Sequence, residues 1–117
     1  MFIEVLKSKI GHARVTAAEL HYEGSITIDS TVIKAAGIIP GEKVHVLNVN
    51  NGSRLETYVI AGKPQSGEVC LNGPAARHGY VGDTLIILSY AICTPEEAKQ
   101  VQSKVVYLDP KNRIKKA

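Results

Sequence analysis

The sequence predicts a mainly β protein, a small closed β-barrel with two or three short helices. About seven short stretches alternate apolar and polar residues, which is typical of strands. Glycine, proline and asparagine separate these stretches at close intervals and indicate turns. No long helical crossover follows any stretch, so a doubly wound parallel sheet is excluded.

The first half of the chain contains four of these stretches, which are residues 2–6, 25–28, 43–49 and 54–61, and residues 14–16 could form another. Asp29 is suited to cap a helix over residues 30–36, and Gly37 is suited to end it. Asn51-Gly52 predicts a hairpin between the last two strands, because both residues tolerate positive φ.

The second half contains three more segments with strand character. They are residues 68–71, 84–90 and 104–108, of which 84–90 is the most apolar and predicts a central strand. One helical turn is expected over residues 75–78. Thr94, Pro95 and Glu97 combine a helix cap, a proline at the first helical position and a capping-box glutamate, which predicts a helix to about residue 102.

Length and composition predict one globular domain over residues 1–117, with 44% hydrophobic and 21% charged residues. No apolar run approaches the ~18 residues of a membrane span. The first residues do not combine a basic segment with a long apolar one, as a signal peptide does. We therefore expect a cytoplasmic protein without a membrane partner.

Cysteine, histidine and charge argue against metal and nucleic-acid sites. Cys70 and Cys93 lie in apolar runs without metal-type spacing, which predicts buried free thiols, and the four histidines are scattered. Much of the net charge of +3 comes from the C-terminal Lys111, Arg113, Lys115 and Lys116. A solvated, frayed tail is the simpler interpretation, and a nucleic-acid arm is the alternative, without interleaved aromatic residues to support it.

Two patterns could carry chemistry, and each has a plainer alternative. Gly24-Ser25 places a hydroxyl beside an unshielded glycine carbonyl that it could attack in a strained backbone; otherwise it is a turn leading into a strand. Arg54 and Tyr58 share a face of a regular strand, so a guanidinium that binds carboxylates would lie near a phenol that donates protons. Otherwise they are a surface arginine and a half-buried tyrosine, and Lys9 is a solvated charge.

Seven segments, taken in order, carry a family resemblance. They are LKSKI (6–10), VT (15–16), LHYEGSITID (20–29), NNGSR (50–54), TY (57–58), NGPAAR (72–77) and VGD (81–83). Their order and spacing in one short chain resemble the bacterial aspartate 1-decarboxylase family. This resemblance implies a double-psi β-barrel assembled as a homotetramer, and a lyase that converts L-aspartate to β-alanine and carbon dioxide for pantothenate biosynthesis.

The resemblance also implies self-cleavage between Gly24 and Ser25 into a beta chain, 1–24, and an alpha chain, 25–117. Ser25 Oγ attacks the Gly24 carbonyl to form an ester, and elimination and hydrolysis leave a pyruvoyl group at the new N-terminus. The pyruvoyl ketone forms a Schiff base with the substrate and acts as the electron sink. No metal and no pyridoxal phosphate are needed, and the involvement of a maturation helper protein is left open.

The resemblance assigns a role to each matching residue. Ser25 and Tyr58 are catalytic, Tyr58 as the proton donor, while Thr57 hydrogen-bonds the Gly24 carbonyl during processing and also lies in the substrate site. Lys9 and Arg54 hold substrate carboxylates. The remaining pocket residues are Gly73, Pro74 and Ala75, with Tyr22 and Asn72 as weaker candidates.

Three features complicate these roles. Thr57 and Tyr58 point to opposite faces of an ideal strand, so both roles need a twist, a bulge or a neighbouring subunit, and we favour a site at a subunit interface. Gly11-His12 stands where the family commonly has His-Arg, so His12 is left out of the site. Pro74 cannot donate a backbone hydrogen bond.

Two non-enzymatic alternatives remain. One is a non-catalytic small β-barrel binding module, such as a nucleic-acid-binding regulator, and the weak net charge argues against it. The other is an inert family member that never cleaves itself. The presence of Gly24-Ser25, Thr57 and Tyr58 argues against that interpretation.

Overall fold

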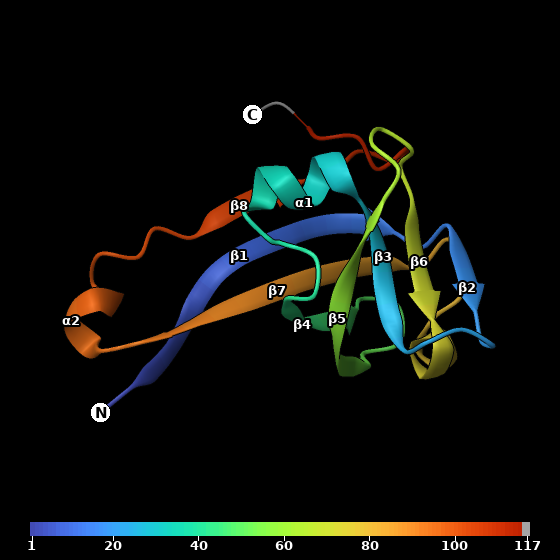
Figure 1. Cartoon of the computed structure of the whole chain (residues 1–117). Coiled ribbons are helices and arrows are strands. Elements are labelled where there is room, and N and C mark those ends of the chain that lie inside the picture. The colour runs from blue at the N-terminus through green and yellow to red at the C-terminus, as the bar shows by residue number, and fades with distance from the viewer. Residues whose placement is uncertain (116–117) are drawn as a thin grey trace.

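A computed structural model describes residues 1–115 as strands joined by short turns and three short helices (Figure 1). In chain order the elements are β1 (Ile3–Arg14), β2 (Ala17–Glu19), β3 (Ser25–Asp29), α1 (Ser30–Ala36), β4 (Lys43–Asn48), β5 (Arg54–Gly62), β6 (Val69–Asn72), the 3-10 helix η1 (Gly73–His78), β7 (Thr84–Cys93), α2 (Pro95–Ala98) and β8 (Lys104–Tyr107). None of the described helices has the length and apolar character that a membrane span requires.

The strands hydrogen-bond in the order β2-β6-β3-β5-β4-β7-β1-β8. β2 stands at one end of this order, yet it follows β1, near the other end, directly along the chain. The link between β1 and β2 is hydrogen-bonded to segments near both ends of the strand order. Val15 donates its N–H to the carbonyl of Asp83, just before β7, at 3.0 Å, and Thr16 donates to the carbonyl of Val69, in β6, at 2.8 Å. The sheet therefore curves round on itself as a barrel.

Parallel and antiparallel pairs are mixed in this sheet. β3 runs parallel to β5, β2 to β6 and β1 to β8, while β1 and β7 form a long antiparallel pair. Figure 1 shows β1 and β7 extending together away from the barrel as an arm that ends near α2. We call this pair the β1–β7 arm.

Alternate residues of the barrel strands form one buried core. Ile26 and Ile28 of β3 and Val44 and Val46 of β4 are almost completely inaccessible to solvent. Full burial of an aliphatic side chain of this size contributes about 1.5–3 kcal/mol. The buried Ile26 and Ile28 therefore hold β3 in the core, and this packing fixes the position of Ser25, the first residue of the strand.

Local signals predicted the first helix and the hairpin correctly. The Asp29 carboxylate accepts from the Thr31 N–H at 2.9 Å, and Gly37 ends α1 at a φ of +71°. β4 and β5 pair antiparallel across a turn in which Gly52 has a φ of +75°. Cys70 and Cys93 are buried free thiols, as expected.

The N-terminal strands differ from the prediction. Residues 2–6 and 14–16 were expected to form separate strands, but a single strand, β1, covers Ile3–Arg14. Pairing with β7 continues through an irregularity between Ile10 and Ala13, where His12 has a φ of +62°. The long partner strand stabilises extended backbone that has no simple alternation of its own, and β2 was not predicted.

The helix α2 and the segment after β8 also differ from the prediction. The capping box of α2 is present, with Thr94 and Glu97 bonded to each other's backbone, but the helix ends at Ala98 rather than near residue 102. Of the solvated, frayed tail, Lys111, Arg113 and Lys115 are exposed as expected, but residues 109–115 are not frayed. Asn112 is buried, and its side chain donates to the carbonyls of Arg14, at 2.9 Å, and Gly67, at 2.8 Å. Lys116 lies outside the described residues.

Candidate active site

The Gly24-Ser25 peptide lies where an exposed bend enters the buried sheet. Gly24 is exposed, whereas Ser25 is the first residue of β3 and is completely buried. The buried Ile26 and Ile28 fix the strand, so the Ser25 side chain points to the face of the sheet opposite to that of Ile26. A serine hydroxyl is therefore held out of water directly beside the glycine carbonyl.

Hydrogen bonds fix the Ser25 hydroxyl from two directions. Its Oγ donates to the Glu23 carbonyl at 3.1 Å and accepts from Asn72 Nδ2 at 3.0 Å. The antiparallel register of β3 and β6 places Ser25 directly opposite Asn72. Asn72, one of the two weaker pocket candidates, thus has a direct contact with the predicted nucleophile.

Gly73 and Pro74 pack against the bend that carries Gly24. Gly73 has a φ of +63°, and a Cβ at this position would lie 2.6 Å from the Tyr22 carbonyl oxygen and 2.8 Å from Gly24 N. A Cβ on Gly24 would meet Pro74 Cδ at 3.3 Å. The two chain segments approach so closely that only glycine fits at position 73 without displacing the bend.

An open depression of about 320 Å³ lies over this bend. Five predicted residues border it: Gly24, Thr57, Tyr58, Pro74 and Ala75. The parallel register of β3 and β5 pairs Ile26 with Val59, and continuing it backwards brings the Gly24-Ser25 peptide level with Thr57 and Tyr58. Although the two side chains differ in burial, both border the same depression within one chain.

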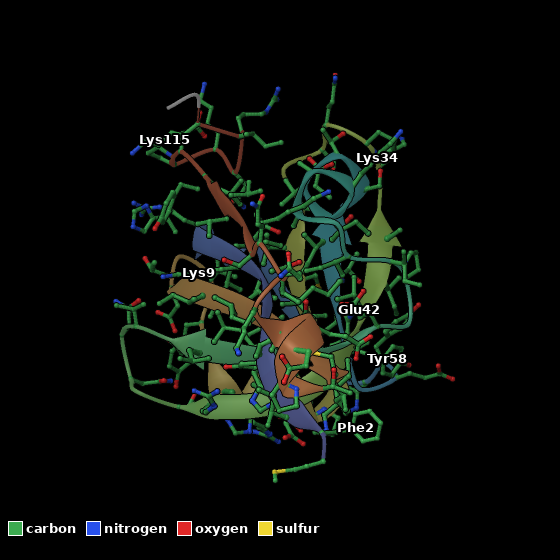
Figure 2. The ribbon with its side chains drawn as sticks, turned by 90° about the vertical axis from the view of Figure 1, so that its left-hand side faces the viewer. Phe2, Lys9, Lys34, Glu42, Tyr58 and Lys115 are labelled. Carbon is green, nitrogen blue, oxygen red and sulfur yellow. The ribbon has the colours of Figure 1, made fainter. Side chains whose placement is uncertain are left out.

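Lys9 and Arg54, the two predicted carboxylate-binding residues, do not border this depression. Neither is among the described residues that line the depression. Lys9 is in the middle of β1, beside β7 and β8, and Figure 2 shows Lys9 and Tyr58 on opposite sides of the molecule. Arg54 donates from Nε to His45 Nδ1 and from Nη2 to the Tyr90 hydroxyl, both at 3.3 Å.

Tyr22 approaches Gly73 with its backbone. Its side chain is 58% exposed, and its carbonyl faces Gly73. His12, which was left out of the predicted site, packs against Tyr107 with ring centroids 5.1 Å apart. Among the described residues, no group of three histidine, cysteine or acidic side chains is arranged to hold a metal ion.

Sequence reasoning missed three residues near the Gly24-Ser25 peptide. Thr27 and Cys70 both contact the Asn72 carboxamide, and His78 borders the depression. Thr27 and Cys70 each lie two residues from a candidate, on the same face of a strand, and this spacing could have identified them. Burial raises the pKa of the Cys70 thiol, and the negative charges of Glu19 and Glu68 raise it further.

Nearly the whole chain is similar to known proteins. Residues 1–115 match the family described as aspartate decarboxylase. The aspartate 1-decarboxylase of Listeria monocytogenes serotype 4a is 54% identical over 97% of this chain and 90% of its own length. Those of Caldicellulosiruptor bescii and Caldicellulosiruptor saccharolyticus are each 56% identical, over 97% and 99% of this chain and 89% and 91% of theirs.

Two designed double-psi barrel proteins were also found among solved structures. They align with TM-scores of 0.49 and 0.48 at 19% and 18% identity, over 66% and 74% of this chain and 90% and 99% of theirs. The strand order described above shows a mainly β barrel with three short helices, so the predicted mainly β class is confirmed. The expected enzyme class, a carboxy-lyase, is confirmed by the family match and by the curated relatives. The chain belongs to the aspartate decarboxylase family.

Proposed function

We propose that this protein decarboxylates L-aspartate to β-alanine and carbon dioxide, for pantothenate biosynthesis, with a pyruvoyl group made from its own Ser25. The observation that carries the proposal is the buried Ser25 hydroxyl beside Gly24, at a depression bordered by Thr57 and Tyr58. Family membership supports the same reaction. The pyruvoyl group supplies the electron sink that decarboxylation requires.

The residues around Ser25 suit the formation of this group. Cleavage between Gly24 and Ser25 yields chains of residues 1–24 and 25–117 from the single domain. Gly24 is exposed at a bend, so its carbonyl is open to attack, and Asn72 donates to the attacking oxygen. Thr57 hydrogen-bonds the Gly24 carbonyl as negative charge develops on it.

The depression beside the cleavage point receives the substrate. Tyr58, which is 38% exposed at its edge, donates a proton to the carbon from which carbon dioxide has left. The backbone of Gly73 and Ala75 contributes to the pocket wall. Pro74 shapes the wall without donating a hydrogen bond.

A homotetramer completes the site. Neither Lys9 nor Arg54 borders the depression of its own chain, so we assign the carboxylate-binding charges to neighbouring copies. Phe2 and Ile92, at the end of the β1–β7 arm, are 69% and 71% exposed. Large exposed apolar side chains of this kind mark interaction surfaces, and a second copy would cover them.

Intact-mass measurement under denaturing conditions tests the proposal. Freshly purified protein of 12.6 kDa is expected to give way to two fragments cut between Gly24 and Ser25, with the larger fragment blocked to N-terminal sequencing. The same sample should weigh four protomers under native conditions and release β-alanine from L-aspartate. A single 12.6 kDa species after prolonged warming, alone or with cell extract, would contradict the proposal.

Replacing Tyr58 with phenylalanine separates cleavage from turnover. We expect Tyr58→Phe to cleave normally, because the phenol takes no part in the acyl shift, and to lose about 10²–10⁴-fold in kcat, the usual contribution of a positioned acid. Cleavage is followed by mass and turnover by β-alanine release. Tyr107→Phe is the control, and wild-type kcat in Tyr58→Phe would remove Tyr58 as the proton donor.

A further inference from the structure

Four side chains lie on one face of two neighbouring strands at the cleavage point. The β3–β6 register pairs Ser25 with Asn72 and Thr27 with Cys70. Side chains alternate along a strand, so residues two apart point to the same side, and the paired residues are neighbours across the strands. Ser25, Asn72 and Cys70 are 0%, 3% and 5% exposed, so water competes little for their hydrogen bonds.

Asn72 is the centre of this group. Its Nδ2 lies 3.0 Å from Ser25 Oγ and 2.8 Å from Thr27 Oγ1, and its Oδ1 lies 3.2 Å from Cys70 Sγ. Both hydrogens of the NH₂ group are therefore used, one on each hydroxyl oxygen. The Ser25 hydroxyl directs its own hydrogen to the Glu23 carbonyl, so it can accept from Asn72.

The orientation of the Asn72 carboxamide depends on its partners, because a carboxamide can turn over and exchange its donor and acceptor ends. Burial and the nearby charges of Glu19 and Glu68 raise the pKa of the Cys70 thiol, so the sulfur keeps its hydrogen. An S–H group donates, and Asn72 Oδ1 is the nearest acceptor, closer than the Leu71 carbonyl at 3.9 Å. The thiol thus favours the carboxamide orientation in which Asn72 Oδ1 faces Cys70 and the NH₂ group faces Ser25.

We propose that Thr27 and Cys70 are positioning residues for self-processing, which hold the Asn72 carboxamide in the orientation that donates to Ser25 Oγ. The inference rests on the proposed function, since it concerns the cleavage that forms the pyruvoyl group. Thr27 receives the second NH₂ hydrogen and Cys70 donates to the carbonyl oxygen. Neither side chain touches the reacting carbonyl, and both act through Asn72.

The donated hydrogen bond assists a defined step. In the acyl shift, Ser25 Oγ attacks the Gly24 carbonyl carbon, the C–N bond breaks, and the hydroxyl proton passes to the Ser25 nitrogen. In the elimination, Ser25 Cα loses a proton, the Cβ–Oγ bond breaks, and Gly24 leaves as a carboxylate that retains Oγ. Negative charge grows on Oγ in this second step, so an N–H donor stabilises it and a carbonyl oxygen turned toward it would oppose it.

The test is the rate at which the full-length precursor disappears, measured by intact mass. Thr27→Val and Cys70→Ala remove one partner each and are expected to slow cleavage about tenfold, the effect of one lost hydrogen bond. Thr27→Ser retains a hydroxyl and Cys70→Ser replaces the thiol with another hydrogen-bond donor, so both are expected to cleave near the wild-type rate. Cys93→Ala, which removes a buried thiol from β7 instead, is the matched control.

Hydroxylamine provides a second readout, because it cleaves an ester at Oγ but not the Gly24–Ser25 amide. We expect the slowed variants to accumulate more hydroxylamine-sensitive precursor than the wild type, since elimination is the step that needs the donor. A merely structural loss would slow cleavage without raising this fraction. A melting curve of each variant shows whether it is folded. If Thr27→Val lacks a cooperative unfolding transition, Thr27→Ala is used in its place.

The outcomes separate the two proposals. A wild-type protein that never cleaves would overturn the proposed function itself. Wild-type cleavage with unchanged rates in folded Thr27→Val and Cys70→Ala would overturn the positioning role alone. The positioning role would also be overturned if cleavage were slow in Thr27→Val and Cys70→Ala, remained slow in Thr27→Ser and Cys70→Ser, and showed no rise in hydroxylamine-sensitive precursor.

Discussion

Replacing Ser25 with alanine is expected to leave one uncut chain of 12.6 kDa and to remove aspartate decarboxylation. Oγ is the only atom of the side chain that can attack the Gly24 carbonyl, and the proposed pyruvoyl group would derive from the same residue. The loss in turnover is expected to exceed about 10⁴-fold, because the variant lacks the electron sink rather than a single hydrogen bond. Intact mass and β-alanine release measure the two effects.

The stability of this variant gives an internal check. Ser25→Ala loses the bonds to Glu23 and Asn72, which is expected to lower the free energy of unfolding by about 1–3 kcal/mol while the fold is retained. Ser103→Ala, on the exposed segment before β8, is the control and should cleave normally. Cleavage between residues 24 and 25 in Ser25→Ala would refute the mechanism.

Replacing Gly73 with alanine is expected to disturb the cleavage point from a position that carries no reactive group. The new Cβ would stand 2.6 Å from the Tyr22 carbonyl oxygen and 2.8 Å from Gly24 N, and both contacts are backbone atoms that cannot turn aside. We expect a loss of about 2–4 kcal/mol in the free energy of unfolding, from overpacking together with an unfavourable positive φ. We expect cleavage to slow by about 100-fold or more, because a displaced Gly24 carbonyl no longer faces Ser25 Oγ.

Gly52 provides a matched control for the backbone effect. It has a φ of +75°, similar to Gly73, but within residues 1–115 no heavy atom lies within 4 Å of a Cβ built there. Gly52→Ala is expected to lose about 1–2 kcal/mol from its left-handed backbone alone and to cleave at the wild-type rate. Equal stability and equal cleavage in the two variants would show that the close approach at Gly73 does not matter.

Elements with local signals were predicted well from the sequence. Asp29 and Gly37 bound α1 because a cap and a left-handed glycine act within a few residues of the helix. Elements whose extent depends on a partner distant in the sequence were not predicted well. β1 extends to Arg14 because β7 pairs along its whole length, and the segment after residue 108 folds back because Asn112 bonds to Arg14 and Gly67.

The candidate site divides in the same way. Alternation along β5 suggested that Thr57 and Tyr58 would need help to serve one site, and the structure places both at one depression because the register with β3 brings them to Gly24. Lys9 and Arg54 were expected beside them. Neither borders the depression: Lys9 lies on β1, and Arg54, at the start of β5, bonds to His45 and Tyr90 instead.

The sequence by itself determined the β class of the fold, the helix and hairpin with local signals, and the family resemblance that singled out Gly24-Ser25. These features depend on residue types and on spacings within short segments. Only the tertiary structure decided that Ser25 is buried, that Gly73 packs on the bend, and that Asn72, 47 residues away, donates to the hydroxyl. Such contacts follow from strand register across the closed sheet, which pairs residues irrespective of their separation in the chain.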